Sequence, residues 1–362
     1  MMIPFIDLTR EWQFFEKAFL TGFKKFGRDG HYVLGKYTEI FEKNFAYQIG
    51  YKYAIGVSTG LTALEIALLA HGINKDDEVI TVSNSAVATS LAISNIGAKP
   101  VFCDVKNDFL IDEKLIERLI TKKTKAILPV HLFGKICNMR VINRLAKQHA
   151  LIVLEDACQA HGANFSGESL KNTKAFSFYP TKNLGALGEA GMIVTNDKAV
   201  YDFAIAFRNY GQKERYNHLI KGNNYRIDSL QCVFLDIKLK ELDNFIDRRR
   251  FIAQRYINEL SEIHDFSIDP FDITSSYHLF VIRVLNGKRD ELKNYLDKSG
   301  ITTLVHYPST IHQQPCYQAE YAKIVLKNTE KLQEEILSLP CYPFFTDTEQ
   351  ALVIDKIKKF FL

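Results

Sequence analysis

ALIVLED, at residues 150–156, is a short apolar run that ends in two carboxylates. It is rich in β-branched residues and therefore predicts a buried strand. Similar runs precede it along the chain: EVITVS (78–83), KPVFCDV (99–105) and AILPVHLF (126–133). Segments with helical spacing separate them: TGLTALEIALLAHGI (59–73), SLAISNI (90–96), EKLIERLI (113–120) and MRVINRLAKQH (139–149). Apolar strands that alternate with helices predict an α/β fold with a mostly parallel sheet between helices.

The alternation of apolar strands and helices ends at about residue 235. The segment 237–263 is amphipathic and predicts one long helix, in which the arginines at 248–250 are expected to form a solvated face. SSYHLFVIRV (275–284) predicts a half-buried strand, and residues 288–300 predict a further helix. A chain of 362 residues can bury more than one core. We therefore expect a large domain at residues 1–240 and a smaller C-terminal α+β domain at residues 241–362.

Composition excludes several classes of protein. The chain has 47% hydrophobic and 24% charged residues, as ordinary globular proteins do, and its net charge of +4 is too small to indicate nucleic-acid binding. No apolar stretch approaches the roughly 20 residues that span a bilayer. The start, MMIPFIDLTREW, lacks the basic and apolar regions of a signal peptide. We expect a cytoplasmic protein that binds neither nucleic acid nor membranes.

The six cysteines lie far apart, so we expect reduced and mostly buried thiols. Cys158 and His161 form a single CxxH pair, which is at best half a metal site. We expect no bound metal.

Asp156 is the first candidate for chemistry. It ends the run ALIVLED beside Glu155, and ligands of parallel sheets bind beyond the carboxyl ends of strands. A carboxylate there needs a cation or several hydrogen-bond donors. Lys182 follows within SFYPTKNLGALG (177–188), a stretch of small residues without an acidic neighbour. Asp156 and Lys182 could form a structural ion pair, and the residues alone leave that alternative open.

Glycines and hydroxyls surround these two residues in the sequence. Gly60 and Leu61 stand at a helix start, which is a natural anion site, although an ordinary N-cap explains the flanking Thr59 and Thr62 equally well. Further residues are expected near Lys182, namely the hydroxyls of Ser177 and Thr181 and three glycines that leave room for a bulky group: Gly185, Gly188 and Gly191. Neither GxGxxG nor GxxxxGK occurs, so a nucleotide cradle is not favoured.

A lysine, a strand-end carboxylate and an anion seat together match the needs of pyridoxal 5′-phosphate. That cofactor requires a lysine for its Schiff base, an acid against its pyridine nitrogen and donors around its phosphate. A dry pocket lowers the pKa of a lysine and frees its amine as a nucleophile. We therefore expect Lys182 to be the Schiff-base lysine and Asp156 to be the partner of the ring nitrogen.

Four stretches resemble the nucleotide-sugar aminotransferases of the DegT/StrS group, which are fold-type I pyridoxal-phosphate enzymes. They are EDACQAHGA (155–163), FSFYPTKNLGALGEAGMIVTND (176–197), NNYRIDSLQ (223–231) and HYPSTIHQQPCY (306–317). The similarity extends from IPFIDL (3–8) to LSLPCYP (337–343). It implies a homodimeric aminotransferase with shared active sites.

The resemblance also implies roles for individual residues. Gln159 would lie near the ring oxygen of the cofactor, whereas Ser177 and the backbone at Gly60 and Leu61 would hold its phosphate. Asn224 would reach that phosphate from the neighbouring subunit. The substrate side of the site would be lined by His306, Tyr307 and Tyr179. Taken without the resemblance, Gln159 and His161 could be polar residues of a helix start, Asn224 a turn residue and His306 a loop cap.

Two positions depart from the usual pattern of the group. Leu61 replaces a threonine, so a hydroxyl contact to the phosphate is lost, and Thr59 or Thr62 could replace it. Ala86, in SNSAVAT (83–89), stands where an aromatic residue would stack on the cofactor ring. Weaker cofactor retention is the expected consequence of both changes.

We expect an enzyme that transfers an amino group from glutamate to a nucleotide-linked keto-deoxysugar. The stretches IPFIDL and HYPSTIHQQPCY look more like relatives that aminate carbon 3, which favours a dTDP-3-keto-6-deoxyhexose over a 4-keto sugar. An amino-acid aminotransferase or lyase stays open, because Arg226 could clamp an α-carboxylate. Dehydratase relatives have histidine in place of the lysine, and a non-enzymatic scaffold would predict loss of Lys182 or Asp156, so both are disfavoured.

Overall fold

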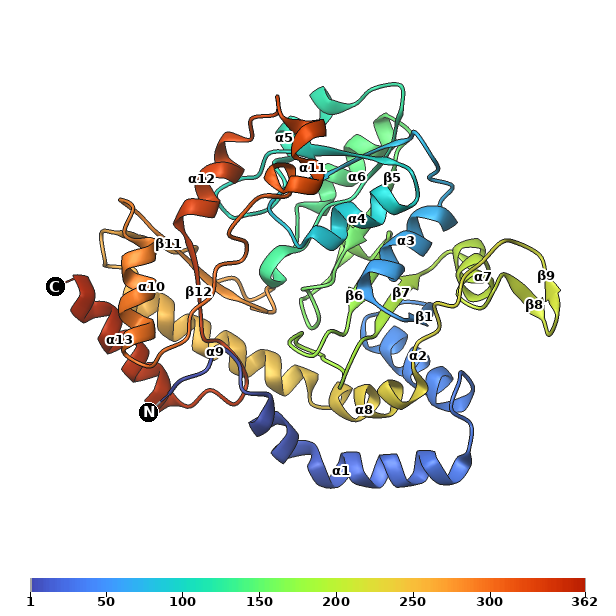
Figure 1. Ribbon diagram of the computed structural model, residues 1–362, viewed down its shortest axis with the longest axis horizontal. Coiled ribbons are helices and arrows are strands. Elements are labelled where there is room, and N and C mark those ends of the chain that lie inside the picture. Colours follow the sequence, from blue (N-terminus) through green and yellow to red (C-terminus); the bar gives the residue numbers. More distant parts are fainter. Residues whose placement is uncertain (1, 362) are drawn as a thin grey trace.

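The computed structural model describes residues 2–361. Within these residues a seven-stranded sheet has the order β1-β7-β6-β5-β4-β2-β3 (Figure 1). Its strands are β1 (Tyr53–Val57), β2 (Glu78–Val82), β3 (Lys99–Cys103), β4 (Thr124–Ile127), β5 (Ile152–Asp156), β6 (Thr173–Ser177) and β7 (Gly191–Thr195). Only β7 runs antiparallel to its neighbours, β1 and β6. The prediction of a mostly parallel sheet is thus confirmed.

Helices cover both faces of this sheet, as the alternation in the strands requires. In β7, Ile193 packs in one apolar cluster, whereas Met192 and Val194 pack in another. The first cluster includes residues of α3 (Gly60–Ala70), α4 (Val87–Asn95) and α7 (Lys198–Phe207). The opposite face is covered by α2 (Lys36–Gln48), α6 (Met139–Gln148) and α8 (Ser229–Leu239). Because all of these helices pack on one sheet, the carboxyl ends of its strands are left to form a crevice.

A second, smaller sheet lies near the carboxyl end of the chain. Its order is β10-β11-β12, with β10 (Phe266–Ser267), β11 (Phe280–Val284) and β12 (Ile336–Leu339). Its apolar cluster includes residues of α9 (Leu242–Leu260), α10 (Arg289–Lys298) and α13 (Asp347–Phe361). The predicted strand at 275–284 forms only over its second half, and the predicted helix at 288–300 is α10. The boundary at residue 240 stays a prediction.

The remaining elements lie at the edges of these layers. They are α1 (Leu8–Asp29), α5 (Glu113–Ile116), α11 (Pro315–Tyr321), α12 (Lys327–Glu335) and the hairpin β8 (Gln212–Glu214) and β9 (Asn217–His218). The hairpin projects from the body (Figure 1). Between residues 2 and 361, every helix is too short or too polar to cross a bilayer.

The expectation of one long helix at 237–263 is wrong. The chain leaves the helical path at Lys240 and Glu241, so α8 and α9 are separate helices. Lys238, at the end of α8, is held by Glu11 and by the carbonyl of Gly185. Helix α8 packs on the large sheet, whereas α9 extends toward the small one (Figure 1).

The expectation that the arginine run forms a solvated face is wrong for Arg249. Its side chain is only 3% exposed and lies on the buried stripe of α9 that also contains Phe245, Ile252 and Tyr256. Its neighbours Arg248 and Arg250 point elsewhere and bind Asp347 and the carbonyl of Ser275.

Candidate active site

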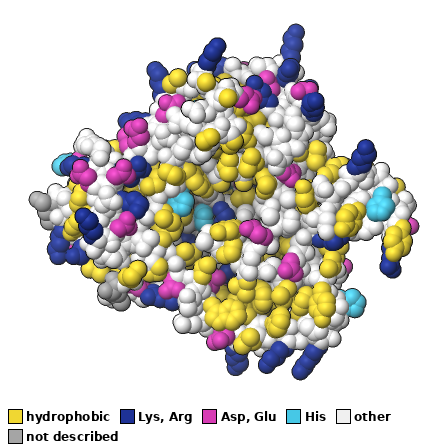
Figure 2. All heavy atoms as spheres, in the orientation of Figure 1, with side chains coloured by type: hydrophobic (Ala, Val, Ile, Leu, Met, Phe, Trp, Pro, Cys, Tyr) yellow, Lys and Arg dark blue, Asp and Glu magenta, His cyan; other side chains and the backbone are white. Residues whose placement is uncertain are grey.

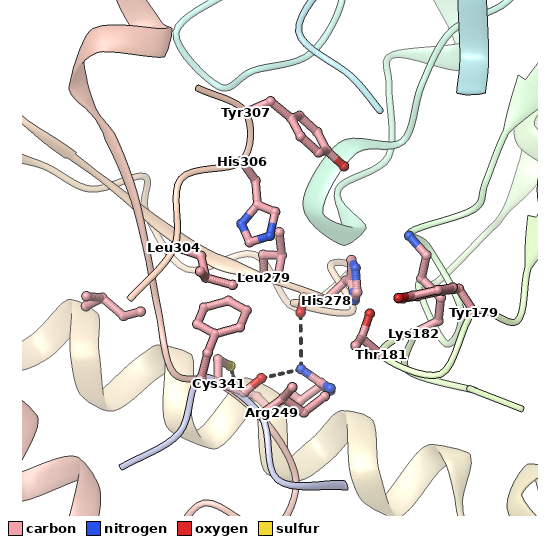
Figure 3. A pocket seen from close by; sticks show the side chains of 13 residues that line it. Tyr179, Thr181, Lys182, Arg249, His278, Leu279, Leu304, His306, Tyr307 and Cys341 are labelled. Carbon is pink, nitrogen blue, oxygen red and sulfur yellow. Dashed lines mark hydrogen bonds between the residues drawn. The ribbon is translucent and has the colours of Figure 1, made fainter. Parts of the chain in front are cut away.

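A cavity of about 350 Å³ lies between the turn that follows β6 in the large sheet and the segments around β11 and β12 of the small sheet. Its polar lining is formed by Tyr179, Thr181, Lys182, Arg249, His278, His306 and Tyr307. Its apolar lining includes Phe5, Ile6, Leu279, Leu304 and Leu339. In Figure 3, Lys182, Thr181 and Tyr179 stand on one side, opposite His306 and Leu304. Figure 2 shows histidine and cationic side chains gathered in a central hollow.

Lys182 stands on a tight turn that follows β6. The amide of Lys182 donates to the carbonyl of Tyr179 at 2.8 Å, and the amide of Ala186 donates to that of Phe178 at 2.8 Å. A Cβ added to Gly185 would lie 2.2 Å from the carbonyl oxygen of Pro180, so the turn requires glycine there. The expectation that Gly185 leaves room for a bulky ligand is therefore wrong, because it allows close approach of the chain to itself.

The amine of Lys182 makes no hydrogen bond or ion pair with any residue between 2 and 361. Burial lowers the pKa of Lys182, and the charges of Cys158 and Asp156 oppose this only partly. Desolvation penalises the ammonium form, so a larger share of the side chain is the neutral amine. An amine at the wall of a cavity can act as a nucleophile and as a base in its deprotonated form, which the lowered pKa favours.

Asp156 is 4% exposed at the end of β5. One carboxylate oxygen accepts from Thr89 Oγ1 at 2.7 Å, and the other accepts from the amide of Cys158 at 3.1 Å. These two donors hold the carboxylate in place without a cation. The prediction that Asp156 ends a buried strand is confirmed.

Asp156 and Lys182 do not form an ion pair in the structure of residues 2–361, so the alternative of a structural pair is not observed. The buried ion pair of this region instead joins Glu155 to Lys174, and both side chains are 0% exposed. Asp156 affects the pKa of Lys182 only through its charge.

The start of α3 lies against the end of β6. A Cβ added to Gly60 would lie 2.6 Å from Ser177 Cβ, and one added to Gly191 would lie 2.2 Å from the carbonyl oxygen of Thr59. The glycines thus let the helix start, Ser177 and β7 meet closely. Since the first amides of a helix have no intrahelical acceptors, those of Gly60 and Leu61 are available to an anion beside Ser177.

Thr59 and Thr62 form the N-cap of α3. Each hydroxyl accepts from the backbone amide of the other residue, at 3.0 Å and 2.9 Å. Both oxygens are therefore committed to a capping box. The ordinary N-cap interpretation of these two threonines is confirmed.

Gln159 links β5 to the loop that carries Tyr307. Its side-chain oxygen accepts from the amide of Phe133 at 2.9 Å, and its nitrogen donates to Tyr307 Oη at 3.0 Å. Burial raises the pKa of Tyr307 to about 12, so the hydroxyl stays protonated at neutral pH. Gln159 lies in a turn, so its interpretation as a residue of a helix start is wrong.

His306 lies beside Tyr307 in the same wall. Its Nδ1 is 2.9 Å from Ser338 Oγ, and its ring is 5.5 Å from that of Phe5. Burial, together with the charge of Lys182, lowers the pKa of His306 to about 4. The ring is therefore neutral at pH 7 and can accept or donate a hydrogen bond without adding charge to the cavity.

Three candidate residues lie at or beyond the edge of the cavity. Tyr179 lines it and is 48% exposed, so it stands at the mouth. Asn224 is exposed in the segment after the β8–β9 hairpin, next to Tyr225, whose carbonyl accepts from the amide of Ser58. Arg226 donates to Asn209 at 2.8 Å and lies over the ring of Tyr210, outside the lining of this cavity.

Sequence reasoning missed Thr89, His278 and Arg249. The helical position of Thr89, one turn after the strand-end segment, carried no distinctive signal. His278 lies in a loop, and its Nδ1 is 3.3 Å from the side-chain oxygen of Asn183. Arg249 did have a signal, because it recurs at helical spacing with Leu242, Phe245 and Tyr256 on one apolar stripe.

No cluster of three or more potential metal-ligating side chains occurs in residues 2–361. All six cysteines are free, and four of them are buried: Cys103, Cys137, Cys232 and Cys341. His161 is 1% exposed, and neither of its ring nitrogens has a hydrogen-bond partner in that part of the chain.

The fold is of the α/β class, and a buried lysine, Lys182, lines the cavity beyond the carboxyl end of β6. The chain belongs to the DegT/DnrJ/EryC1/StrS aminotransferase family, which matches residues 15–358. The predictions of family, fold class and enzyme class are thereby confirmed.

Three similar proteins illustrate this relationship. The chain is 40% identical over 365 residues to the dTDP-3-amino-3,6-dideoxy-alpha-D-galactopyranose transaminase of Aneurinibacillus thermoaerophilus, covering 99% of both chains. It is 37% identical over 368 residues to the "Pleiotropic regulatory protein" of Geobacillus stearothermophilus, covering 100% of this chain and 99% of the relative. The crystal structure of NtdA from Bacillus subtilis with bound cofactor PMP has a TM-score of 0.96 at 34% identity, covering 99% of this chain and 85% of that one.

Proposed function

We propose that this aminotransferase moves an amino group from glutamate to carbon 3 of a dTDP-linked 3-keto-6-deoxyhexose. The observation that carries the proposal is the unpartnered amine of Lys182, which lines the cavity and whose pKa is affected by the charge of Asp156. The transaminase of A. thermoaerophilus, named for a dTDP-3-amino sugar, supports the choice of carbon and nucleotide.

The cofactor is pyridoxal phosphate, and the residues fit it. The close approach of Gly60 to Ser177 leaves helix amides and a hydroxyl for a phosphate, and Asp156 offers a carboxylate, held by two donors, for a pyridinium nitrogen. Bound pyridoxal phosphate supplies an electron sink for the bonds of the substrate carbon. Ser177, Gly60, Leu61 and Asn224 are proposed to hold the phosphate, and Gln159 to lie at the ring oxygen.

Lys182 is proposed to move the proton of the reaction. Burial lowers the pKa of Lys182, which favours Nζ as the base that takes the proton from the α-carbon of the amino donor. In the second half-reaction Nζ would deliver a proton to the former keto carbon of the sugar, and in both half-reactions the bound cofactor would be the other partner of the proton transfer. Thr89 and the amide of Cys158 keep Asp156 in place throughout.

His306, Tyr307 and Tyr179 are proposed to bind the sugar. His306 is neutral at pH 7 and Tyr307 keeps its proton, so both present uncharged hydrogen-bonding groups. The apolar lining near His306, which includes Phe5 and Leu304, suits the methyl group of a 6-deoxysugar. A wall of this kind favours a hexose without a 6-hydroxyl, because a buried hydroxyl there would lack a partner.

A homodimer with shared sites is part of the proposal. Helix α1 exposes Trp12, Phe14 and Phe23, and Figure 2 shows a broad hydrophobic patch at the lower edge, where α1 lies. Large apolar patches mark interaction surfaces. Hybrid dimers of Lys182→Ala and Asn224→Ala chains should regain activity, since one of their two sites is intact. Absence of recovery despite proven subunit exchange would contradict a shared site.

The substrate is tested by product analysis. Purified enzyme is incubated with glutamate and each of the dTDP- and UDP-linked 3-keto and 4-keto sugars, and the products are examined by NMR. We expect an amino group at carbon 3 of the dTDP-linked 3-keto-6-deoxyhexose, because a one-carbon shift removes the keto carbon from the roughly 3–3.5 Å needed for attack. An amino group at carbon 4, with the 3-keto sugar untouched, would contradict the proposal.

A further inference from the structure

Arg249 is a buried cation without an acidic partner. Its Nη1 donates to the carbonyls of Tyr277, at 3.3 Å, and His278, at 3.2 Å, and to that of Cys341. Its Nε is buried and has no hydrogen-bond partner among residues 2–361. Within the same residues, Nη2 makes no hydrogen bond, and no carboxylate lies within 4.0 Å of the guanidinium. A buried charge left in this state is costly unless a ligand compensates it.

The surroundings do not supply the missing negative charge. The acid whose charge acts on Arg249 is Glu11, but the carboxylate of Glu11 pairs with the ammonium of Lys238, which is itself only 1% exposed. Two buried cations therefore share one carboxylate, and a positive charge remains.

The cavity beside Arg249 has the same imbalance. Its lining contains two basic side chains, Lys182 and Arg249, and no aspartate or glutamate. Figure 3 shows Arg249 below His278, with Thr181 between it and Lys182 in projection. A positive cavity of this kind suits an anionic ligand that must also reach Lys182.

We propose that Arg249 binds a carboxylate of the amino-acid donor. The three carbonyls fix the plane of the guanidinium, so little side-chain entropy is lost when a carboxylate accepts hydrogen bonds from its unpaired Nε–Nη2 edge. The dTDP-linked sugar carries its negative charge on a diphosphate, which ring atoms separate from the keto carbon, whereas the donor carries a carboxylate directly on the carbon that reacts at Lys182. This inference rests on the proposed aminotransferase function and assigns its donor subsite.

The test separates the two half-reactions in the holoenzyme. In the first half-reaction glutamate removes the visible absorption band of the lysine-bound cofactor. Arg249→Gln should raise the glutamate concentration that removes half of this band by about 10- to 100-fold, as expected for loss of a charge-assisted hydrogen bond. Amination of the keto-sugar by the aminated enzyme should stay within about threefold of wild type. Arg250→Gln is the matched control, since Arg250 binds the carbonyl of Ser275 outside this cavity.

Calorimetry with glutarate, an unreactive dicarboxylate, provides a readout independent of turnover. Glutarate should bind wild-type and Arg250→Gln holoenzyme alike and bind Arg249→Gln at least tenfold more weakly. If Arg249→Gln does not fold, Arg249→Lys keeps the charge but loses the planar fork, and it should show the same selective loss for the donor.

Three results would overturn the inference: equal impairment of both half-reactions, impairment of the sugar half-reaction alone, or unchanged glutarate binding in Arg249→Gln. The second would assign Arg249 to an anionic part of the sugar substrate. If the wild type aminates no keto-sugar but glutarate binding still depends on Arg249, the proposed sugar substrate fails and the donor subsite stands.

Discussion

Two lysine–carboxylate combinations lie on neighbouring strands, and they are built in opposite ways. Lys174 of β6 and Glu155 of β5 are both 0% exposed and form an ion pair, and Glu155 also accepts from His131 at 2.6 Å and from Asn172 at 2.7 Å. Within residues 2–361, the carboxylate of Asp156, the next residue of β5, accepts only from Thr89 and from the amide of Cys158, and the side-chain amine of Lys182 has no hydrogen-bonding partner.

The difference separates a structural pair from a reactive one. Burial alone would raise the pKa of Glu155, but Lys174 and His131 hold it below its ordinary value, so the carboxylate is ionised and satisfied. A satisfied pair has no free donor or acceptor for a substrate. The amine of Lys182 has no such partner among residues 2–361. An unpaired buried amine lowers stability, and groups of this kind occur mainly at functional sites, where the free amine is needed for the reaction.

Removing the two lysines should give the largest contrast. Lys182→Ala should lower turnover by more than about 10⁴-fold while leaving the fold and noncovalent cofactor binding intact, because nucleophile and base are lost together. Lys174→Met should retain the chemistry in its folded fraction but lose about 3–5 kcal/mol of stability, because Glu155 stays buried without its cation. Steady-state kinetics and urea unfolding measure both. Full activity of Lys182→Ala would contradict the assignment.

The two carboxylates should differ in the same way. Asp156→Asn should lower kcat by about 10³-fold, which corresponds to ~4 kcal/mol of barrier, without a large change in melting temperature. Glu155→Gln should instead destabilise the fold, because Lys174 loses its charge partner. Kinetics and thermal unfolding are measured on both variants. An Asp156→Asn enzyme within threefold of wild type would mean that this carboxylate is structural too.

A smaller effect is expected at the anion seat. Gly60→Ala places a methyl group 2.6 Å from Ser177 Cβ, so the helix start and β6 must separate and the affinity for pyridoxal phosphate should fall about tenfold or more. Gly27→Ala is the matched control, since nothing lies within 4 Å of its added Cβ. Titration of the apoenzyme with cofactor measures both. Equal cofactor affinities of the two variants would contradict a role of Gly60 in the phosphate-binding site.

The smallest effect extends the comparison to a third carboxylate. Arg10 binds Glu349 through two hydrogen bonds, of 2.9 Å and 2.6 Å, and lowers the pKa of Glu349 from 4.5 to about 2. Because the folded-state pKa is depressed, the stabilisation is complete above pH 4.5 and is lost as the pH falls toward 2.

Denaturation curves from pH 6 to pH 2 test this point. Between pH 6 and pH 2 the free energy of unfolding of the wild type should fall by roughly 1–3 kcal/mol more than that of Glu349→Gln. Asp202→Asn is the exposed control, because the Lys198–Asp202 pair is 62% and 57% exposed and such pairs contribute little. Identical pH dependence of wild type and Glu349→Gln would contradict the role of the Arg10–Glu349 pair.

The sequence predicted the large sheet well because its strands are short apolar runs with turns and helices between them. Asp156 and Lys182 could be singled out because each is a charge in an apolar or small-residue context. The break at Lys240 and Glu241 was not predictable from periodicity, because the buried residues keep their helical spacing across it, from α8 into α9.

The burial of Arg249 could not be read from the composition of the arginine run at 248–250. Three consecutive arginines look solvated as a group, yet a helix presents successive residues about 100° apart, so one of the three can face the core. The hydroxyls of Thr59 and Thr62 likewise could not be assigned to the cap or to a ligand until their partners were known.

The most direct measurement of the central claim is the site of covalent attachment of the cofactor. The holoenzyme is reduced with borohydride, digested and analysed by mass spectrometry. The account predicts a pyridoxyl group on the peptide that contains Lys182 and none on the peptide that contains Lys174. A modified Lys174, or holoenzyme in which Lys182 remains unmodified, would contradict it.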